Sequence, residues 1–228
     1  MTTYFSDASL KFLRGLARNN DKTWFNAHRE QYEEHVRRPF QRLLVDLQPD
    51  LAAISTRYSA DPRPVGGSMY RIFRDARYSS DKSPYKPWQG ARLCHERRKQ
   101  VPAPSFYIHL QPGENFVGAG LWHPEPDTQR RVRQFIFDNP GGWKAATHKP
   151  GFRRRYEFDT EDRLSRPPRG YPADFEFIED LKHRNFVFWR QLDDAVMTGP
   201  RLRQVLVADF NALAPFVDYL CAALDLEF

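Results

Sequence analysis

The stretch from Arg71 to Lys86, R-I-F-R-D-A-R-Y-S-S-D-K-S-P-Y-K, concentrates residues that bind anions. Its five cations and two carboxylates leave a surplus of three positive charges, half of the net charge of +6. Guanidinium groups bind phosphate or carboxylate through paired hydrogen bonds, and ammonium groups add mobile charge. We therefore expect a pocket for a phosphorylated or carboxylated small molecule. The candidate ligand-binding residues are Arg71, Arg74, Asp75, Arg77, Ser79, Asp81, Lys82, Tyr85, Lys86 and, further along the chain, His123.

The same stretch also has a purely structural interpretation. Asp75 and Asp81 can pair with the arginines and hold a long loop on a sheet, with Pro84 fixing its exit. Charged networks often serve architecture, so charge alone does not identify a site. The arginines recur at every third position, which would align them on a helix but not on a strand. We expect a strand that runs into a loop near Arg74.

Catalysis would require a base, a nucleophile or a metal close to the bound ligand. Asp75 and Asp81 are candidate bases, and His123 is a candidate general acid or base, although a histidine beside tryptophan is more often packed. The sequence contains no HExxH, GxGxxG or GxxxxGK[ST] motif. We expect no metal and no cofactor, and the residues leave open whether the protein is an enzyme.

Composition favours a single folded domain over residues 1–228. Aromatic residues make up 14% of the chain, with 18 Phe and 5 Trp, which is ample apolar surface for one core. Cys94 and Cys221 stand apart from any CxxC or histidine cluster, so neither a disulfide framework nor a zinc site is indicated. The N-terminus lacks a signal-peptide pattern, and no apolar run approaches the roughly 20 residues that span a bilayer. We expect a cytoplasmic protein without a membrane partner.

A sequence pI of about 9.4 makes nucleic acid the competing partner. Two basic runs, Arg97 to Lys99 and Arg153 to Arg155, could contact phosphates, and nearby aromatic residues could stack on bases. These aromatic residues are Phe106, Tyr107, Trp122 and Tyr156. Because no recognised nucleic-acid-binding consensus is present, this alternative is less favoured than a small anion.

A third alternative is a non-catalytic interaction module with a structural salt-bridge network. It would present the aromatic N-terminal residues Trp24, Phe25 and Tyr32 to a partner, although core packing is the better prediction for them. The sequence predicts no particular oligomeric state.

Helical periodicity dominates both ends of the chain. Ser6 or Asp7 can cap a helix that continues to Asn19, and Asp21 can cap a second helix that ends before Pro39. A third apolar stripe runs from Phe40 to Ile54. We expect these helices to form one layer. Further helices are predicted from Asp127 to Asn139, from Phe175 to Leu181 and from Pro200 to Leu224, the last with a potential kink at Pro215.

The middle of the chain predicts strands at 69–73, 91–95, 106–110 and 116–121. A Pro-Gly turn at 110–115 should join two of them as a hairpin, and Gly118-Ala119-Gly120 is typical of a closely packed strand. The basic stretch 149–169 is predicted to be an exposed, irregular connection. Together these elements predict an α+β fold in which N-terminal and C-terminal helices pack on a central antiparallel sheet.

Four blocks of the sequence resemble one known family. They are L-A-R-N-N-D-K-T-W-F-N-A-H-R-E-Q-Y-E, the 71–86 stretch, G-A-G-L-W-H-P and R-P-P-R-G-Y. Together they resemble a conserved bacterial family, domain of unknown function 2461, over about residues 5–220. The resemblance implies a cytoplasmic single domain without an assigned reaction, and it transfers no catalytic residue. At Leu164-Ser165-Arg166 relatives are expected to carry Leu-Lys-Arg, so Ser165 removes one cation from that loop.

Overall fold

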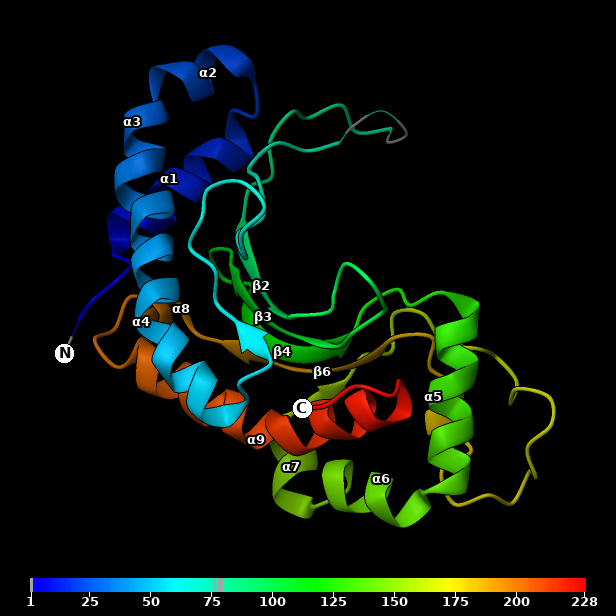
Figure 1. The fold of residues 1–228 in the computed structure, drawn as a ribbon. Coiled ribbons are helices and arrows are strands. Elements are labelled where there is room, and N and C mark those ends of the chain that lie inside the picture. Colours follow the sequence, from blue (N-terminus) through cyan, green and yellow to red (C-terminus); the bar gives the residue numbers. More distant parts are fainter. Residues whose placement is uncertain (1, 76, 78–79) are drawn as a thin grey trace.

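A strongly curved antiparallel sheet forms the centre of the molecule, and helices lie at both ends of the chain (Figure 1). The computed structural model describes residues 2–75, 77 and 80–228. The sheet has six strands in the order β1-β2-β3-β4-β6-β5. This architecture confirms the predicted α+β class. The strands are β1 Tyr58–Ser59, β2 Gln89–His95, β3 Ser105–Leu110, β4 Asn115–Leu121, β5 Glu157–Phe158 and β6 Phe186–Leu192.

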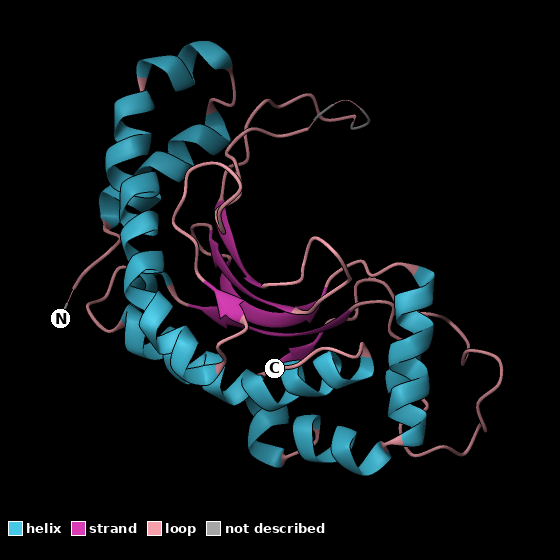
Figure 2. Cartoon of the chain, viewed as in Figure 1, coloured by secondary structure: helices cyan, strands magenta, loops and turns pink. Residues whose placement is uncertain are grey.

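The described helices lie along the convex face and the ends of the sheet (Figure 2). They are α1 Asp7–Arg18, α2 Lys22–Ala27, α3 Arg29–Tyr32, α4 Arg38–Ile54, α5 Pro126–Asp138, α6 Pro140–Thr147, α7 Pro150–Arg155, α8 Asp194–Met197 and α9 Leu202–Ala223. A π-helical turn spans Glu33–Arg37, and a 3-10 turn spans Asp180–Lys182.

The predicted caps begin the first two helices. Ser6 precedes α1, and its amide donates to Ser9 Oγ at 3.0 Å. Asp21 precedes α2, and its carboxylate accepts from the Trp24 amide at 2.9 Å. Both contacts satisfy backbone or side-chain groups that a helix start leaves unpaired.

Pro39 does not separate two helices as predicted. The chain passes from α3 through the π-helical turn directly into α4, whose first turn contains Pro39. In this turn the Arg38 amide donates to the Glu33 carbonyl, five residues back. A π turn loosens the hydrogen-bond ladder, so the missing donor and the ring of proline fit without ending the helix.

Three other predictions of local structure need correction. Residues 69–73 form no strand; only Met69 and Phe73 make isolated bridges. The basic stretch 149–169 contains α7 and β5 before it becomes irregular. Residues 175–181 form turns and the start of the 3-10 helix, not an α-helix.

The strands bury one face under helices. Phe106 on β3 packs against Phe210 of α9, with ring centroids 5.1 Å apart, and Phe188 on β6 packs against Phe216 at 4.9 Å. α9 is long and apolar enough to cross a membrane by length and composition alone, but it packs here on β4 and α4. It continues as one helix through Pro215.

A buried carboxylate ties α9 to the sheet and to α7. Asp209 of α9 is fully buried and accepts two hydrogen bonds from Arg190 of β6, at 2.7 and 2.6 Å. Arg155 and the Tyr156 hydroxyl also donate to Asp209, each at 2.7 Å. We call these four residues the Asp209 cluster. Every charge in it has a partner.

Candidate functional site

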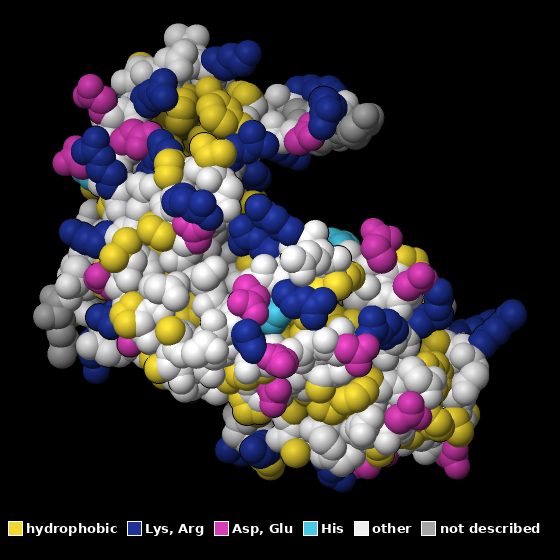
Figure 3. Space-filling view, in the orientation of Figure 1, with side chains coloured by type: hydrophobic (Ala, Val, Ile, Leu, Met, Phe, Trp, Pro, Cys, Tyr) yellow, Lys and Arg dark blue, Asp and Glu magenta, His cyan; other side chains and the backbone are white. Residues whose placement is uncertain are grey.

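The concave face of the sheet carries a cavity of about 790 Å³, which we call the sheet cavity. Side chains of β2, β3, β4 and β6 form its floor, and residues 157–161 form one wall. In the space-filling view a deep recess separates this face from the projecting segment above it (Figure 3). Cavities of this size accommodate small organic ligands.

Strand register places five lining residues in one row across the sheet. Paired residues of antiparallel strands share a face, and the pairs here are Arg92 with Tyr107, Tyr107 with Gly118, Gly118 with Trp189, and Trp189 with Glu157. The row therefore begins with a cation and ends with an anion. Between them lie a phenol, a glycine whose Cβ would lie 2.9 Å from the Trp189 Cβ, and an indole.

Arg92 supplies the cationic end of the row. Its side chain is partly buried, and its Nε donates to Ser105 Oγ at 2.8 Å. A longer contact of 3.5 Å reaches the Ala103 carbonyl. Burial raises the pKa of Tyr70, and the nearby Arg92 guanidinium partly offsets that rise. Among the described residues, no carboxylate forms an ion pair with Arg92.

A chain of hydrogen bonds runs from the floor to the rim. The Tyr107 hydroxyl lies 2.9 Å from His109 Nδ1, His109 Nε2 lies 3.0 Å from Gln111 Oε1, and Gln111 Nε2 lies 2.6 Å from Glu114. Because the Glu114 carboxylate accepts, Gln111 must turn its amide nitrogen toward it and its oxygen toward His109. We assign the Nε2-protonated tautomer to His109 on this basis, so Tyr107 donates to Nδ1.

Burial favours the neutral forms of the Tyr107 and His109 side chains at pH 7. It raises the pKa of Tyr107 above its ordinary value. It lowers the pKa of His109, although the Gln111 hydrogen bond opposes that change. Gly90 makes room for the phenol, since a Cβ there would lie 2.3 Å from the Tyr107 oxygen. The sequence thus uses a glycine on β2 to place a hydroxyl on β3.

Aromatic rings line much of the cavity. His109 stacks on Phe116 with centroids 4.5 Å apart, and Trp88 lies 4.8 Å from His109. Trp189 meets Phe116 edge-on at 5.8 Å. Flat rings of this kind offer stacking surfaces for planar groups.

Carboxylates form the wall opposite Arg92. Glu157 and Glu161 are exposed and line the cavity, and neither forms an ion pair among the described residues. Asp159 is 8% exposed and accepts from Asn185 at 2.9 Å. The cavity therefore has a basic side and an acidic side.

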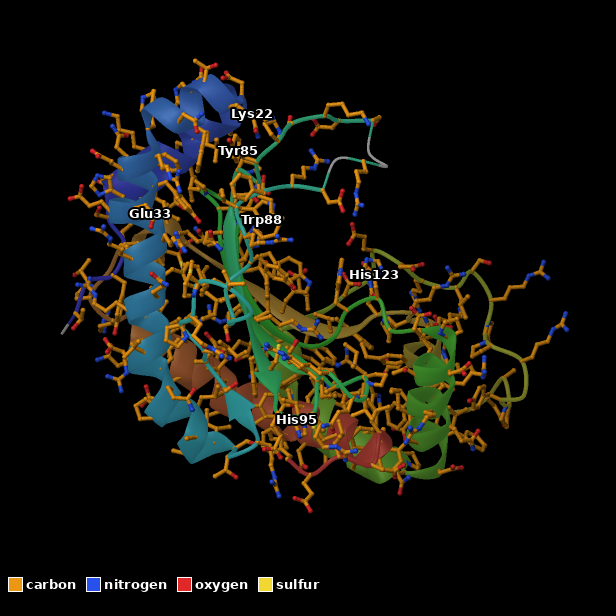
Figure 4. The ribbon with its side chains drawn as sticks, turned by 45° about the horizontal axis from the view of Figure 1, so that its top comes forward. Lys22, Glu33, Tyr85, Trp88, His95 and His123 are labelled. Atoms are coloured by element: carbon orange, nitrogen blue, oxygen red, sulfur yellow. The ribbon has the colours of Figure 1, made fainter. Side chains whose placement is uncertain are left out.

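The described residues between Tyr70 and Trp88 form a projecting segment beside the cavity, which we call the arm. Its two limbs are joined by backbone hydrogen bonds from Arg74 to the Pro84 carbonyl and from Lys86 to the Ile72 carbonyl. Asn20 binds the base of the arm through two hydrogen bonds. Its side chain donates to the Tyr85 carbonyl and accepts from the Tyr85 amide. Figure 4 shows Tyr85 at this base and His123 across the opening from Trp88.

The predicted anion-binding residues lie on the arm and at the rim of the cavity. Arg77 pairs with Asp75 at 2.7 Å, and Arg74 pairs with Asp81. The two carboxylates pair with the arginines, as the structural interpretation predicted, and both of these pairs lie within the arm. Asp81 also accepts from the Ser83 amide and hydroxyl.

The remaining predicted residues have varied surroundings. The Lys86 ammonium donates to the carbonyls of Arg71 and Phe73, at 2.8 and 3.0 Å, and lies 5.5 Å from the Trp88 ring. The Tyr85 ring is buried and stacks on Phe25 at 4.1 Å. Arg71 and Lys82 are exposed. Ser79 lies outside the described residues.

His123 is exposed and is not packed into the core. It occupies a left-handed conformation with φ 47°, and its amide donates to Asn185. None of the predicted site residues that the structure describes belongs to the lining of the sheet cavity. Their role in binding stays a prediction.

The basic run from Arg153 to Arg155, proposed for nucleic acid, does not form one surface with the cavity. Arg153 and Arg155 lie on α7, on the helical side of the sheet (Figure 1), where they pair with Asp180 and Asp209. Of the aromatic residues in that proposal, Phe106 and Tyr156 are buried in the core. Only Tyr107 and Trp122 line the cavity.

Sequence reasoning missed the residues that define the cavity. Arg92, Trp189 and Glu157 were not singled out, and Tyr107 was considered only for base stacking. A signal was present in S-F-Y-I-H-L of β3, where Ser105, Tyr107 and His109 alternate with apolar residues. Such alternation marks a strand whose second face is free for chemistry.

Two comparisons bear on the identity of the chain. The family model for the conserved hypothetical protein DUF2461 matches residues 8–219, which is most of the sequence. Comparison with curated proteins gave no match. Because the matched range includes the whole sheet and the arm, the chain belongs to the DUF2461 family of conserved hypothetical proteins.

Proposed function

We propose that the protein binds a small organic anion in the sheet cavity, with Arg92 holding a carboxylate or phosphate group of the ligand. The observation that carries this proposal is the state of Arg92. It is a partly buried cation that lines the cavity and has no carboxylate partner among the described residues. A guanidinium in such a place is a ready partner for an oxyanion.

The surroundings of Arg92 suit a ligand with a flat body. Tyr107 lies directly opposite on the next strand and supplies a hydroxyl. Trp189 and Phe116 offer apolar ring surfaces further along the floor. A planar group can stack there while its anionic group reaches Arg92.

The arm takes a secondary role in this proposal. Its cations Arg74 and Arg77 are engaged by carboxylates of the arm itself. Lys86 stands over the rings of Tyr70 and Trp88, which do line the cavity. Lys86 can therefore add positive potential at the rim, and the arm shapes the entrance.

We place this binding in the cytoplasm. Cys94 and Cys221 are both free and buried. Burial raises the pKa of Cys221 to about 11, so its thiol stays protonated and unreactive at neutral pH. Two unpaired structural thiols suit a reducing compartment.

The test measures binding of aromatic carboxylates and aromatic phosphates by thermal shift and isothermal titration calorimetry. Wild type is compared with Arg92→Gln, Arg74→Ala and the control Arg131→Gln, whose cation pairs with Asp225 on the surface. A ligand at 100 times its Kd stabilises by about 2.7 kcal/mol, which is readily measured. We expect Arg92→Gln to weaken binding at least tenfold, while Arg74→Ala and Arg131→Gln do not.

Two results would overturn the proposal. Binding that survives Arg92→Gln but is lost in a folded Arg74→Ala variant would move the site to the arm. A wild-type protein that binds no carboxylate and no phosphate would remove the anion site altogether.

A further inference from the structure

We infer that the ligand of the sheet cavity is an elongated dipolar molecule, a short peptide with free termini, whose carboxylate binds Arg92 and whose ammonium group binds Glu157 and Glu161. This inference rests on the proposed function, since it assumes that Arg92 holds the anionic end. It adds the chemistry of the opposite end and the length between them.

The acidic wall is available to a cation from outside the chain. Three arginines of the neighbouring segments pair with other carboxylates. Arg155 pairs with Asp209, Arg163 pairs with Glu179, and Arg184 pairs with Asp162. Glu157 and Glu161 form no ion pair among the described residues and face the cavity. Their negative charge therefore stays uncompensated there.

The register sets the distance between the two ends. Arg92 lies on β2 and Glu157 on β5, so four strand spacings separate them in the order β2-β3-β4-β6-β5. At about 4.8 Å for each spacing, this is about 19 Å along the sheet. The curvature of the sheet and the length of both side chains shorten the span that a ligand must bridge (Figure 2).

This span excludes a single amino acid as a ligand for both ends, because its ammonium and carboxylate share one carbon. An extended peptide advances about 3.3–3.6 Å per residue. Three to five residues therefore cover about 10–18 Å and match the separation of the charges. A cavity of about 790 Å³ is large enough for such a peptide.

The floor favours an aromatic residue in the peptide. The Phe116 ring lies between Tyr107 and Trp189, with ring centroids 5.4 and 5.8 Å away, so the floor there is a continuous aromatic surface. A peptide ring laid on this surface contacts Phe116 and Trp189, both of which line the cavity. Aromatic pairs of this kind add stability beyond the area that they bury.

The experiment uses the full chain and tetrapeptides with one internal tryptophan. Each peptide is made with free termini, N-acetylated, C-amidated or blocked at both ends, and 3-(indol-3-yl)propionate serves as an anion without an ammonium group. Affinities are measured by calorimetry for wild type, for the double variant Glu157→Gln/Glu161→Gln and for Arg92→Gln. Glu30→Gln, an exposed acid on α3, is the matched control. Thermal unfolding checks that each variant is folded.

For wild type we expect N-acetylation to weaken binding about three- to tenfold, and C-amidation to weaken it at least as much. N-acetylation should have no further effect on binding by the double variant, because that variant lacks the carboxylates that bind the ammonium group. C-amidation should likewise have no further effect on Arg92→Gln, which lacks the guanidinium that binds the carboxylate. A series of two to six residues should bind best at three to five.

The failures of the two proposals are distinguishable. If indolepropionate and the N-acetylated peptide bind as tightly as the free peptide, and Arg92→Gln abolishes all binding, the anion site stands and the dipolar inference is overturned. Equal affinity of wild type and the double variant for the free peptide would also overturn the inference alone. If no anionic probe binds, both proposals fail.

Discussion

Two charged clusters lie on opposite faces of the same sheet, and they differ in whether their charges are matched. On the convex side Asp209 is fully buried, and two arginines and a tyrosine donate to it. On the concave side Arg92 and Glu157 lie at the two ends of one row, and the described residues supply neither with an ion-pair partner. The first cluster joins β6 to α7 and α9, whereas strand register places the second.

The difference separates charges that the fold pairs from charges that have no ion-pair partner among the described residues. A buried charge without partners is costly, and the Asp209 cluster avoids that cost by complete pairing. Charges at an open cavity remain hydrated and need no partner within the fold. The arm resembles the convex cluster in this respect, because Asp75 and Asp81 pair with its own arginines.

The largest expected effect comes from breaking the matched cluster. Asp209→Asn leaves Arg190 and Arg155 beside a neutral amide in a buried place, and we expect a loss of about 3–5 kcal/mol of unfolding free energy. Asp225→Asn is the control, since that carboxylate is 91% exposed beside Arg131 and should change stability by less than about 1 kcal/mol. Urea unfolding of both variants measures the effect. Equal, small losses would contradict the structural role of Asp209.

A second prediction concerns the backbone that both faces share. Gly120 has φ 135°, and a Cβ there would lie 1.9 Å from the Phe186 carbonyl oxygen of β6. Gly120→Ala should cost about 2–3 kcal/mol and should also weaken ligand binding, because the pairing of β4 with β6 forms the cavity floor.

Gly141→Ala is its control. Gly141 lies in α6, and a Cβ there meets nothing within 4 Å. Alanine at this position should keep or slightly raise stability. Denaturant unfolding of both variants gives the comparison, and a Gly120→Ala protein as stable as wild type would refute the close approach of the two strands.

Neutralising the unmatched charges should have a much smaller effect on stability. Arg92→Gln and Glu157→Gln are each expected to change the unfolding free energy by no more than about 0.5 kcal/mol, because neither removes an ion pair within the fold. The same urea titrations test this. A loss as large as that of Asp209→Asn would mean that these charges hold the sheet together, and the contrast between the two faces would disappear.

The smallest effect is a local titration in the arm. The Ser83 hydroxyl and amide and the Arg74 guanidinium lower the pKa of Asp81 from 3.8 to about 2. Because the folded pKa lies below the unfolded one, these contacts contribute fully above about pH 4 and are lost as the pH falls through 2. An NMR titration should give a midpoint near pH 2 for Asp81, with the Ser83 amide shifting in parallel. A midpoint near 3.8 would show that the arm is not held by its own charges.

The long helices α1, α4, α5 and α9 and the strands β2, β3 and β4 could be predicted because their patterns are local. The caps at Ser6 and Asp21 and the hairpin at 110–115 all depend on neighbours within a few positions. The prediction at Pro39 was wrong because a π turn accommodates the proline ring. The sequence shows the proline but gives no sign of that turn.

The cavity could not be predicted to the same extent, because its row draws one residue from each of five strands. The pairing of β4 with β6 brings Gly118 next to Trp189 across 71 positions of sequence. Net charge drew attention to the arm, yet a sum of charges does not distinguish cations that pair with adjacent aspartates from a cation such as Arg92. The alternation of polar and apolar residues within β2 and β3 was the available clue. It identifies the residues that share the cavity face of each strand, but it does not identify their partners on the other strands.

The strand order also has a consequence during synthesis. The basic side of the cavity is complete once β2 and β3 have left the ribosome, whereas Glu157, Trp189 and the covering helix α9 follow much later. Domains form progressively as the chain emerges, and exposed apolar strands are prone to aggregate before they are covered. A nascent chain that stops before Glu157 would present an uncovered sheet and only the basic side of the cavity. Under the proposed binding mode, a ligand that contacts both sides of the cavity stabilises only the finished protein and cannot guide its early folding.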